Sequence, residues 1–479
     1  MCGFVGVTGQ EAVAPTIAMA LAALQHRGQD AAGAATYHKG RLHLFKDLGM
    51  VATVMSENVV RKLPGTSGIG HVRYPTIGSG SREDSQPFLT RRPGILLAHN
   101  GNVTNYDELE RDLRAVGMHV LSHCDAEPIL LVLTDELMKI RAVHHTTDDL
   151  IVAAKNMMTR VRGSYSASAV LDLDGKETLI AFRDPHGIRP AVYGRNKGAW
   201  MVASESVSLD VTGFDVVDHI APGHLVIMRK GEEAQVISIL PKETRHCVFE
   251  RVYFARPDAI TDEERVNATR WKFGRKLATE WAKKDLEADI VIAIPDTSRP
   301  AAQAMAEKLG LYTREGFIKN RYSGRTFIMP DQATRDLALR LKLNPIREFF
   351  EGKKVILVDD SVVRGSTMRR IVAMIQKLNP SEVHLAIYSP PVTNPCFYGI
   401  DMPTKDELVA AQFSPAELEG ALAKRFNVDS VTFLSIEGMR DVAGESICDA
   451  CFTGDYVIPV SAVEQEALQS DSAGRENAN

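Results

Sequence analysis

Residues 355–367 constrain the fold of this chain more than any other segment. Val355–Val358 is a fully apolar run, and Asp359 and Asp360 follow it directly. A loop that contains Gly365 then leads into a helical segment that stops near Asn379. A short apolar run that is followed at once by a helix is typical of a strand in a parallel α/β sheet.

Three other apolar runs alternate with helical segments in the same half of the chain. They are Asp289–Ile294, Val383–Tyr388 and Ser430–Leu434. Alternating strands and helices predict a parallel sheet, whose ligands gather beyond the carboxyl ends of the strands. The two aspartates and their loop fall at such an end, so we expect a ligand site there.

The first 240 residues have a different texture. Short apolar runs such as Gly94–Ala98 and Ala199–Ala203 are bounded by Gly, Pro and Asn, which predicts packed antiparallel sheets. Helical periodicity is clear in Ala12–Leu24 and Asp125–Leu137. We therefore predict an α+β domain over residues 2–240 and an α/β domain over residues 241–462. Residues 463–479 are polar and aperiodic, and we expect a disordered tail there.

The composition excludes several classes of protein. Lysine and arginine total 56 against 61 aspartates and glutamates, so the formal charge of −5 gives no general attraction for nucleic acid or an anionic membrane. No apolar run approaches the roughly 18 residues of a spanning helix, and the N-terminus lacks the pattern of a signal peptide. We expect a cytoplasmic protein with neither nucleic acid nor membrane as a partner.

Cys2 directly follows the initiator methionine. If Met1 is removed, Cys2 carries both a thiol and a free α-amino group, whose pKa of roughly 8 suits a general base near neutral pH. One residue would then supply both nucleophile and base. A cysteine at position 2 is by itself more often incidental, so this interpretation depends on the motifs that follow.

Three motifs, each at a predicted turn, follow Cys2. They are His26–Asp30 (His-Arg-Gly-Gln-Asp), His71–Thr76 (His-Val-Arg-Tyr-Pro-Thr) and His99–Asn102 (His-Asn-Gly-Asn). Together with Cys2 they resemble the N-terminal-nucleophile glutamine amidotransferase family over roughly residues 2–235. The resemblance implies an αββα sandwich with glutaminase activity.

The same resemblance implies roles for individual residues. Asn100 and Gly101 would supply the donors for the tetrahedral oxyanion that forms from the amide. Arg27 and Arg73 would bind glutamine, whose carboxylate suits a guanidinium, and Asp125 would bind its ammonium group. In isolation, a surface ion pair for Arg73, a helix N-cap for Asp125 and a simple turn for Asn100 and Gly101 would be the favoured explanations.

Residues 359–367 carry the features of a phosphate site. Backbone N–H groups at a helix start, with hydroxyl groups beside them, suit a phosphate, but two adjacent carboxylates would repel it unless they face hydroxyls or a cation. The segment resembles the phosphoribosyl pyrophosphate (PRPP) motif of type I phosphoribosyltransferases, in which the acidic pair contacts the ribose hydroxyls and the loop holds the 5′-phosphate. The resemblance implies PRPP contacts from Asp359, Asp360, Ser361, Arg364, Gly365, Ser366 and Thr367.

Two further segments resemble the same family. The Pro-Asp-Thr-Ser segment around Thr297 looks like the loop for pyrophosphate and Mg²⁺, which implies Thr297, Asp359 and Asp360 on the metal side. The segment from Lys319 to Phe327, including Arg321, resembles the mobile loop that closes over PRPP. There the cations of Lys319 and Arg321 would neutralise pyrophosphate; a solvated basic loop is the alternative.

The order of the two halves resembles the glutamine phosphoribosylpyrophosphate amidotransferase family, to about residue 460. The resemblance implies that ammonia from glutamine passes internally from Cys2 to C1 of PRPP. The products would be 5-phosphoribosylamine, glutamate and pyrophosphate, in the first committed step of purine nucleotide synthesis. It also implies inhibition by purine nucleotides and a homotetramer. Glutaminases that make glucosamine phosphate or glutamate carry different second halves, so residues 355–367 distinguish them.

The chain has six cysteines, too few for a disulfide scaffold. Cys448 and Cys451 form a Cys-x-x-Cys pair, and Cys247 and Cys396 are available as further ligands. Four thiolates suit either a [4Fe–4S] cluster or tetrahedral zinc, which spacing alone does not separate. Their surroundings resemble the iron–sulfur branch of the family, so we expect a [4Fe–4S] cluster with a structural role. We expect Cys124 to pack in a core.

Two other functions are compatible with parts of the sequence. A PRPP-sensing regulator could keep a relic glutaminase domain, but the joint presence of Cys2, Arg73, Asn100, Gly101 and Asp125 disfavours a relic. An iron–sulfur oxygen sensor with incidental catalysis is the second alternative. Glutamine-dependent release of pyrophosphate tests the first, and iron and sulfide analysis of anaerobically purified protein tests the cluster.

Overall fold

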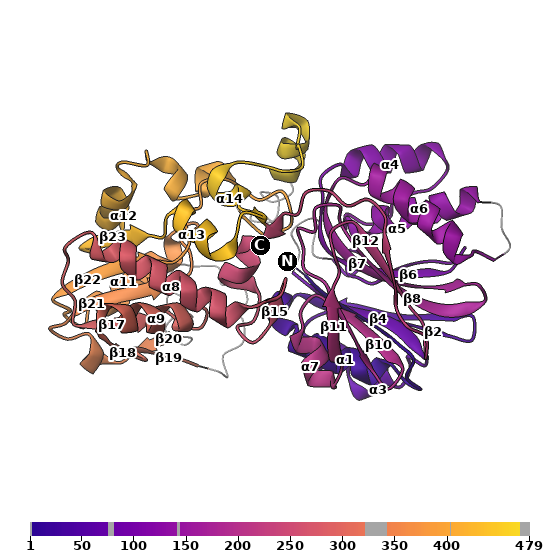
Figure 1. Ribbon diagram of the computed structural model, residues 1–479, viewed down its shortest axis with the longest axis horizontal. Coiled ribbons are helices and arrows are strands. Elements are labelled where there is room, and N and C mark those ends of the chain that lie inside the picture. Colours follow the sequence, from indigo (N-terminus) through magenta and orange to yellow (C-terminus); the bar gives the residue numbers. More distant parts are fainter. Residues whose placement is uncertain (1, 75–80, 141–143, 321–342, 403, 470–479) are drawn as a thin grey trace.

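The chain forms two lobes of different architecture that lie side by side (Figure 1). The computed structural model describes residues 2–74, 81–140, 144–320, 343–402 and 404–469. The N-terminus lies between the two lobes (Figure 1). Within these ranges, no helix combines the length and the apolar character that crossing a membrane requires.

Two antiparallel sheets make up the first lobe. The seven-stranded sheet has the order β11-β9-β10-β1-β4-β2-β3, and the six-stranded sheet has the order β13-β12-β8-β7-β6-β5. The strands of the first sheet are β1 (Gly3–Thr8), β2 (Ala31–His38), β3 (Arg41–Leu48), β4 (Ser67–Arg73), β9 (Val192–Asn196), β10 (Ala199–Ala203) and β11 (Asp215–His219). Those of the second are β5 (Phe88–Thr90), β6 (Ile95–Val103), β7 (Gly163–Leu173), β8 (Lys176–Arg183), β12 (His224–Met228) and β13 (Gln235–Ser238).

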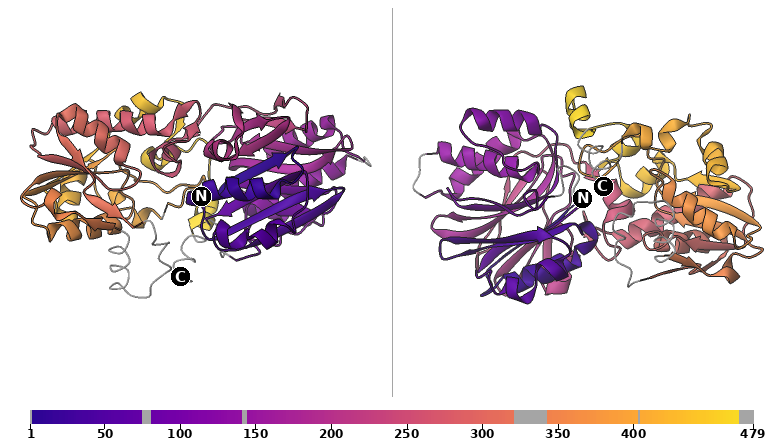
Figure 2. Two further views of the ribbon diagram at one scale, coloured as in Figure 1. Left: turned by 90° about the horizontal axis from the view of Figure 1, so that it is seen from below. Right: turned by 180° about the vertical axis from the view of Figure 1, so that it is seen from behind.

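Helices cover the outer face of each sheet (Figures 1 and 2). Against the seven-stranded sheet lie α1 (Ala14–Ala23), α2 (Val51–Val54), α3 (Glu57–Val60) and α7 (Val207–Thr212), and a short 3₁₀ turn (Gln25–Arg27) follows α1. Against the six-stranded sheet lie α4 (Tyr106–Ala115), α5 (Ala126–Lys139) and α6 (Thr147–Arg160). Apolar side chains of both sheets, such as Phe4 and Leu96, meet in a core between them. These layers confirm the predicted αββα sandwich.

A five-stranded parallel sheet forms the centre of the second lobe, as predicted. Its order is β18-β17-β21-β22-β23. The strands are β17 (Ile290–Ala293), β18 (Tyr312–Arg314), β21 (Lys354–Asp359), β22 (Glu382–Ile387) and β23 (Ser430–Phe433). The helices are α8 (Val266–Ala282), α9 (Arg299–Leu309), α11 (Ser366–Gln376), α12 (Leu418–Phe426), α13 (Ile436–Ala443) and α14 (Ala450–Thr453).

β21 shows why its sequence is continuously apolar. Ile356 and Val358 pack in the core under α8 and α9, whereas Val355 and Leu357 pack in the core under α11 and α12. Successive side chains of a strand point to opposite faces, and helices cover both faces of this sheet. The strand therefore needs an apolar residue at every position.

Short elements connect and flank the two lobes. They are the parallel pair β14 (His246–Cys247) and β24 (Ile447–Cys448), the hairpins β15 (Ile260–Thr261) with β16 (Glu264–Arg265) and β19 (Phe317–Lys319) with β20 (Leu343–Pro345), a π-helical turn (Glu250–Phe254), and 3₁₀ turns at Arg347–Phe349, Lys405–Glu407 and Ala410–Gln412. The pairing of β14 with β24 ties the C-terminal part of the chain to the start of the second lobe.

The prediction of a disordered tail from residue 463 is wrong for residues 463–469. Residues 462–469 form a helix. Arg162 of the first lobe pairs with Glu464 at 2.7 Å, and Leu468 packs against the core of the second lobe. These contacts join distant segments, so the local polarity of the tail gave no sign of them. Residues 470–479 lie outside the described part of the chain.

Candidate functional site

Cys2 lies at the start of the central strand of the seven-stranded sheet. β1 is buried along its whole length and pairs with β10 on one side and with β4 on the other. The Cys2 N–H donates to Asn100 Oδ1 at 3.3 Å, and the Cys2 carbonyl accepts from Arg27 Nε at 3.0 Å. The thiol donates to the Tyr74 carbonyl at 3.6 Å. The strand and these contacts hold the cysteine at a defined position.

Asn100 and Gly101 lie beside Cys2, near the end of β6. Asn100 is 1% exposed, and its Nδ2 is a buried donor with no hydrogen-bond partner among the described residues. A Cβ at Gly101 would collide with the Ser164 carbonyl of the neighbouring strand β7, so this position admits only glycine. An unsatisfied amide donor beside a thiol suits an oxyanion that forms during attack on an amide.

Arg73 and Asp125 supply opposite charges to the same buried region. Arg73 ends β4, Asp125 precedes α5, and both are less than a tenth exposed. Asp125 Oδ2 accepts from the Val103 N–H at 3.0 Å and lies 3.3 Å from His99 Nε2. Burial opposes ionisation of Asp125, but His99, the Val103 N–H and Arg73 outweigh it and hold its pKa below the usual value. The pair thus offers an anion and a cation to the two ends of a free amino acid.

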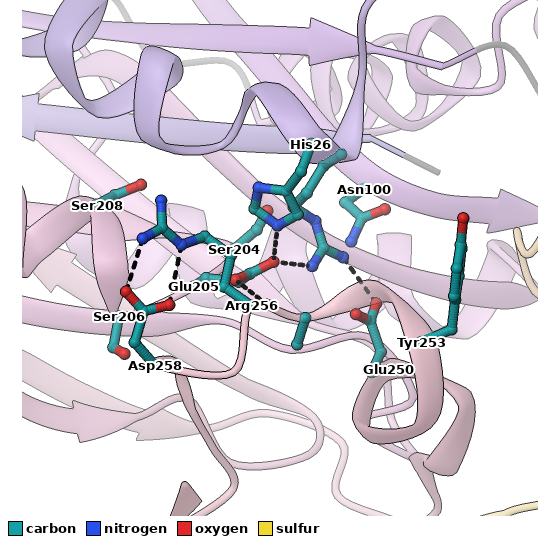
Figure 3. Close-up of polar contacts among 12 residues, drawn as sticks. His26, Asn100, Ser204, Glu205, Ser206, Ser208, Glu250, Tyr253, Arg256 and Asp258 are labelled. Atoms are coloured by element: carbon teal, nitrogen blue, oxygen red, sulfur yellow. Dashed lines mark hydrogen bonds and ion pairs between the residues drawn. The ribbon is translucent and has the colours of Figure 1, made fainter. Parts of the chain in front are cut away.

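Arg27 lies among buried carboxylates beside Cys2. Its guanidinium is fully buried and pairs with Glu205 and with Glu250 Oε1, the latter at 2.7 Å. Burial opposes its charge, but Glu250 and Glu205 outweigh this and raise the pKa of Arg27 above its usual value. Glu205 also bonds His26, as Figure 3 shows. These contacts make Arg27 a support for Cys2, and the predicted contact with glutamine stays a prediction.

The predicted PRPP segment lies at the carboxyl end of β21, the middle strand of the parallel sheet. The strand ends at Asp359, and α11 begins at Ser366. Gly365 precedes the helix with a φ of 72°, and a Cβ there would lie 2.9 Å from the Phe426 ring. Backbone conformation and packing therefore both favour glycine at this turn.

Asp359 and Asp360 lie together with Thr297. Because β17 and β21 are parallel neighbours, the loops after them meet at the same edge of the sheet. The Thr297 hydroxyl donates to Asp360 Oδ2, and the Ser361 hydroxyl donates to Oδ1 at 2.5 Å. Burial raises the pKa of both aspartates, and the charge of Asp360 raises that of Asp359 further. Hydroxyl groups or a cation are what two such carboxylates require to stay ionised. The fold thus gathers the three residues predicted on the Mg²⁺ side.

The other predicted PRPP contacts surround this edge. Arg364, Ser366 and Thr367 are exposed around the start of α11. Lys319 ends β19 and pairs with Asp296, next to Thr297. Residues 321–327 of the predicted mobile loop, Arg321 among them, lie outside the described residues, as do residues 75–76 of the His71–Thr76 motif.

Four cysteines from three segments come together next to the first lobe. Cys247 and Cys448 are register partners in the pairing of β14 with β24, and the Cys451 carbonyl accepts from the N–H groups of residues 393 and 394, close before Cys396. All four pack in or against one core. Burial raises the pKa of Cys451 well above its usual value, and the charges of the other three thiols add to the effect. Within the described residues, no three His, Cys, Asp or Glu side chains are grouped so that they could hold a metal ion.

Two family models match the two lobes. A glutamine amidotransferase domain matches residues 71–211, and a phosphoribosyl transferase domain matches residues 270–389. The amidophosphoribosyltransferase of Pseudomonas aeruginosa is 41% identical, over 95% of this chain and 93% of that protein. The amidophosphoribosyltransferase of Methanocaldococcus jannaschii is 40% identical, over 96% and 98%. The chain belongs to the amidophosphoribosyltransferase family.

Solved structures of this family agree with the fold. The glutamine PRPP amidotransferase of B. subtilis, solved with ADP and GMP, superposes with a TM-score of 0.85 at 36% identity, over 96% of this chain and 98% of that one. A second structure, described as the allosteric regulatory enzyme of purine biosynthesis, gives 0.85 at 35% identity, over 96% and 97%.

Several residues that support the site in this amidophosphoribosyltransferase family member were missed in the sequence. Glu205 and Glu250 lie 178 and 223 positions from Arg27, and in the sequence both resemble ordinary surface carboxylates. Arg189, which donates to the Glu250 carboxylate at 3.3 Å, was missed for the same reason. The position of Glu250, three residues after Cys247, was the one local sign that it lies near a site.

Proposed function

We propose that this chain hydrolyses glutamine at Cys2 and transfers the ammonia to C1 of PRPP, giving 5-phosphoribosylamine, glutamate and pyrophosphate. The observation that carries the proposal is the combination of two sites in one chain. A strand-held cysteine beside the unsatisfied amide nitrogen of Asn100 lies in one lobe, and an acidic pair at the end of a parallel strand lies in the other. The names of the relatives support this choice of reaction.

In the first lobe the reaction is acyl transfer. The Cys2 sulfur attacks the side-chain amide carbon of glutamine, and the amide oxygen becomes an oxyanion that Asn100 and Gly101 stabilise. The carbon–nitrogen bond then breaks, and the nitrogen takes a proton and leaves as ammonia. Water hydrolyses the thioester, which releases glutamate and restores the thiol. Arg73 and Asp125 hold the carboxylate and the ammonium group of the substrate.

In the second lobe, ammonia displaces pyrophosphate at C1 of the ribose with inversion. Asp359 and Asp360 orient the ribose hydroxyls, and the start of α11 binds the 5′-phosphate through its backbone N–H groups. Mg²⁺ would be held on the side of Thr297 and the acidic pair, and when bound it supplies positive charge for the departing pyrophosphate.

Product stoichiometry tests this function. With both substrates present, we expect glutamate and pyrophosphate to appear in equal amounts, and pyrophosphate release should also proceed with ammonium salts in place of glutamine. Binding of PRPP without any release of pyrophosphate would instead identify a regulatory protein with a relic glutaminase.

Asn100→Ala should lower the glutaminase kcat selectively. The substitution removes the buried Nδ2 donor and the Oδ1 acceptor of the Cys2 N–H. Loss of one oxyanion donor lowers kcat by about 10²–10³-fold. We expect this loss with glutamine and unchanged kinetics with ammonium. Asn156→Ala, a matched change at an exposed position on α6, should leave both reactions unchanged. Retention of full glutaminase activity by Asn100→Ala would contradict the assignment.

We also propose that Cys247, Cys396, Cys448 and Cys451 hold a [4Fe–4S] cluster. Four thiols in one buried region have the ligand chemistry of such a cluster. A cluster of four irons is larger than one ion, so its ligands lie farther apart than those of a mononuclear site. The pairing of Cys247 with Cys448 supports a structural role, because the cluster would link the end of the chain to the start of the second lobe.

Metal analysis tests the cluster. Anaerobically purified protein should contain about four iron and four sulfide per chain. Cys448→Ser should lose this iron, whereas Cys124→Ser, in the core of the first lobe, should keep it. One zinc per chain in place of iron would contradict the proposal.

Regulation by purine nucleotides belongs to the same proposal. The B. subtilis structure that superposes on this chain was solved with ADP and GMP, which supports nucleotide binding here. The homotetramer and the cytoplasmic location stay predictions from the sequence.

A further inference from the structure

A buried row of charged side chains connects Cys2 with Cys247, one of the four cysteines of the proposed cluster. Arg27 donates from Nε to the Cys2 carbonyl at 3.0 Å and from a terminal nitrogen to Glu250 Oε1 at 2.7 Å. The same Glu250 oxygen lies 3.3 Å from a terminal nitrogen of Arg189. Arg189 in turn contacts the Cys247 sulfur at 3.7 Å. Figure 3 draws Glu205 and Glu250 with the hydrogen bonds that hold them in this group.

Arg189 also attaches to the loop that carries Cys396. Its Nε donates to the Tyr398 carbonyl at 2.8 Å. The Ser164 hydroxyl donates to the same carbonyl at 2.7 Å, so residues of the first lobe hold this loop from two sides. Arg189 therefore lies between the glutaminase site and two of the segments that bear cysteines.

The side chains of this buried row are held rigidly because they are enclosed by the protein. Arg27, Glu205, Glu250 and Arg189 are each at most 1% exposed. Removing one partner from such a group leaves an uncompensated buried charge, which is strongly unfavourable. Because Glu250 Oε1 is shared by Arg27 and Arg189, a shift of either guanidinium changes the bonds of the other.

A second contact links the same loop to β6, the strand that carries Asn100 and Gly101. Gly399 lies so close to β6 that a Cβ there would be 2.7 Å from the Gly101 carbonyl oxygen. The Asn102 side chain donates to the Phe397 carbonyl at 2.8 Å. The loop after Cys396 thus touches the strand that carries Asn100, while Arg189 reaches Cys2 through Glu250 and Arg27.

We propose that Glu250 and Arg189 are positioning residues for the nucleophile. They fix the position of the Arg27 guanidinium, and through it the position of the Cys2 carbonyl relative to Asn100. Their own positions are set by the segments that carry Cys247 and Cys396. The inference rests on the proposed function, since it assigns Cys2 as the nucleophile. Neither residue touches glutamine or PRPP in this account, so we expect their loss to lower the glutamine-dependent reaction and to leave the ammonia-dependent reaction unchanged.

Kinetics of three variants test this inference. Misplacement of a reacting group by about 1 Å costs about 10²-fold in rate. We expect Glu250→Ala to lower the glutamine-dependent kcat by about that factor, with little change in the KM for glutamine and unchanged ammonia-dependent synthesis. Glu250→Gln keeps an acceptor for both arginines and should restore part of the kcat. Arg189→Lys should resemble Glu250→Ala.

Two further measurements separate positioning from a structural role. The rate of Cys2 alkylation by iodoacetamide should fall in Glu250→Ala and recover in part in Glu250→Gln, while iron content stays at the wild-type level. The exposed Glu233→Ala, which removes an ion pair with Arg195, is the matched control and should change nothing.

The inference would be overturned if Glu250→Gln and Arg189→Lys lowered glutamine-dependent and ammonia-dependent synthesis equally. It would also be overturned if neither variant lost glutamine-dependent activity. Failure of the wild-type protein to release glutamate and pyrophosphate together is a separate result, which would overturn the proposed function instead.

Discussion

Cys2→Ala should abolish glutamine-dependent synthesis of phosphoribosylamine and leave ammonia-dependent synthesis intact. The reason is that the nucleophile and the general base of the glutaminase both belong to this residue, and no described residue of the site offers a second activated thiol. Burial raises the pKa of Cys124, the other cysteine of this region, to about 12, which keeps it protonated. Removal of a nucleophile that acts as one unit with its base costs up to about 10⁶-fold in kcat.

The measurement is pyrophosphate release with each nitrogen donor. We expect a loss of at least about 10³-fold with glutamine, and wild-type values of kcat and of the KM for PRPP with ammonium. The ammonia reaction serves as the internal control for folding of the second lobe. A Cys2→Ala protein that still uses glutamine would show that the nucleophile lies elsewhere.

The double change Asp359→Asn and Asp360→Asn should abolish synthesis with both nitrogen donors. A hydrogen bond to a charged group contributes about 1.5–3 kcal/mol, so loss of two should lower kcat/KM for PRPP by roughly 10²–10⁴-fold. The change also removes two adjacent carboxylates whose ionisation is opposed by burial. The variant should therefore be at least as stable as the wild type toward heat, so that the lost activity cannot be ascribed to unfolding.

Asp441→Asn provides the matched control, because Asp441 lies on the surface of the same lobe and pairs with Lys276. It should leave kcat/KM unchanged. Normal ammonia-dependent synthesis in the double variant would move the PRPP site away from the end of β21.

The sequence predicted those parts of the site that depend on contiguous residues. The acidic pair, Gly365 and the helix start at Ser366 belong to one strand–loop–helix unit, so local patterns were enough to define it. The strand that follows Cys2, β1, could be predicted in the same way, since every residue of β1 is apolar or small.

Contacts between distant segments could not be predicted in this way. The resemblance implied a contact of Arg27 with glutamine, but it did not indicate the partners Glu205 and Glu250 that fix the position of its guanidinium. The helix at residues 462–469 likewise depends on Arg162 and on the core of the second lobe. A periodicity or a short motif holds no information about such partners, which the tertiary fold alone brings together.

Transfer of the amide nitrogen of glutamine tests the central claim most directly. The protein is given PRPP and glutamine labelled with ¹⁵N in the side-chain amide, in the presence of unlabelled ammonium, and the trapped phosphoribosylamine is analysed by mass spectrometry. Internal passage of ammonia from Cys2 to C1 predicts product that carries ¹⁵N, with one pyrophosphate released for each glutamate. Product that takes its nitrogen from the unlabelled ammonium, or glutamate released without pyrophosphate, would contradict the coupling of the two sites.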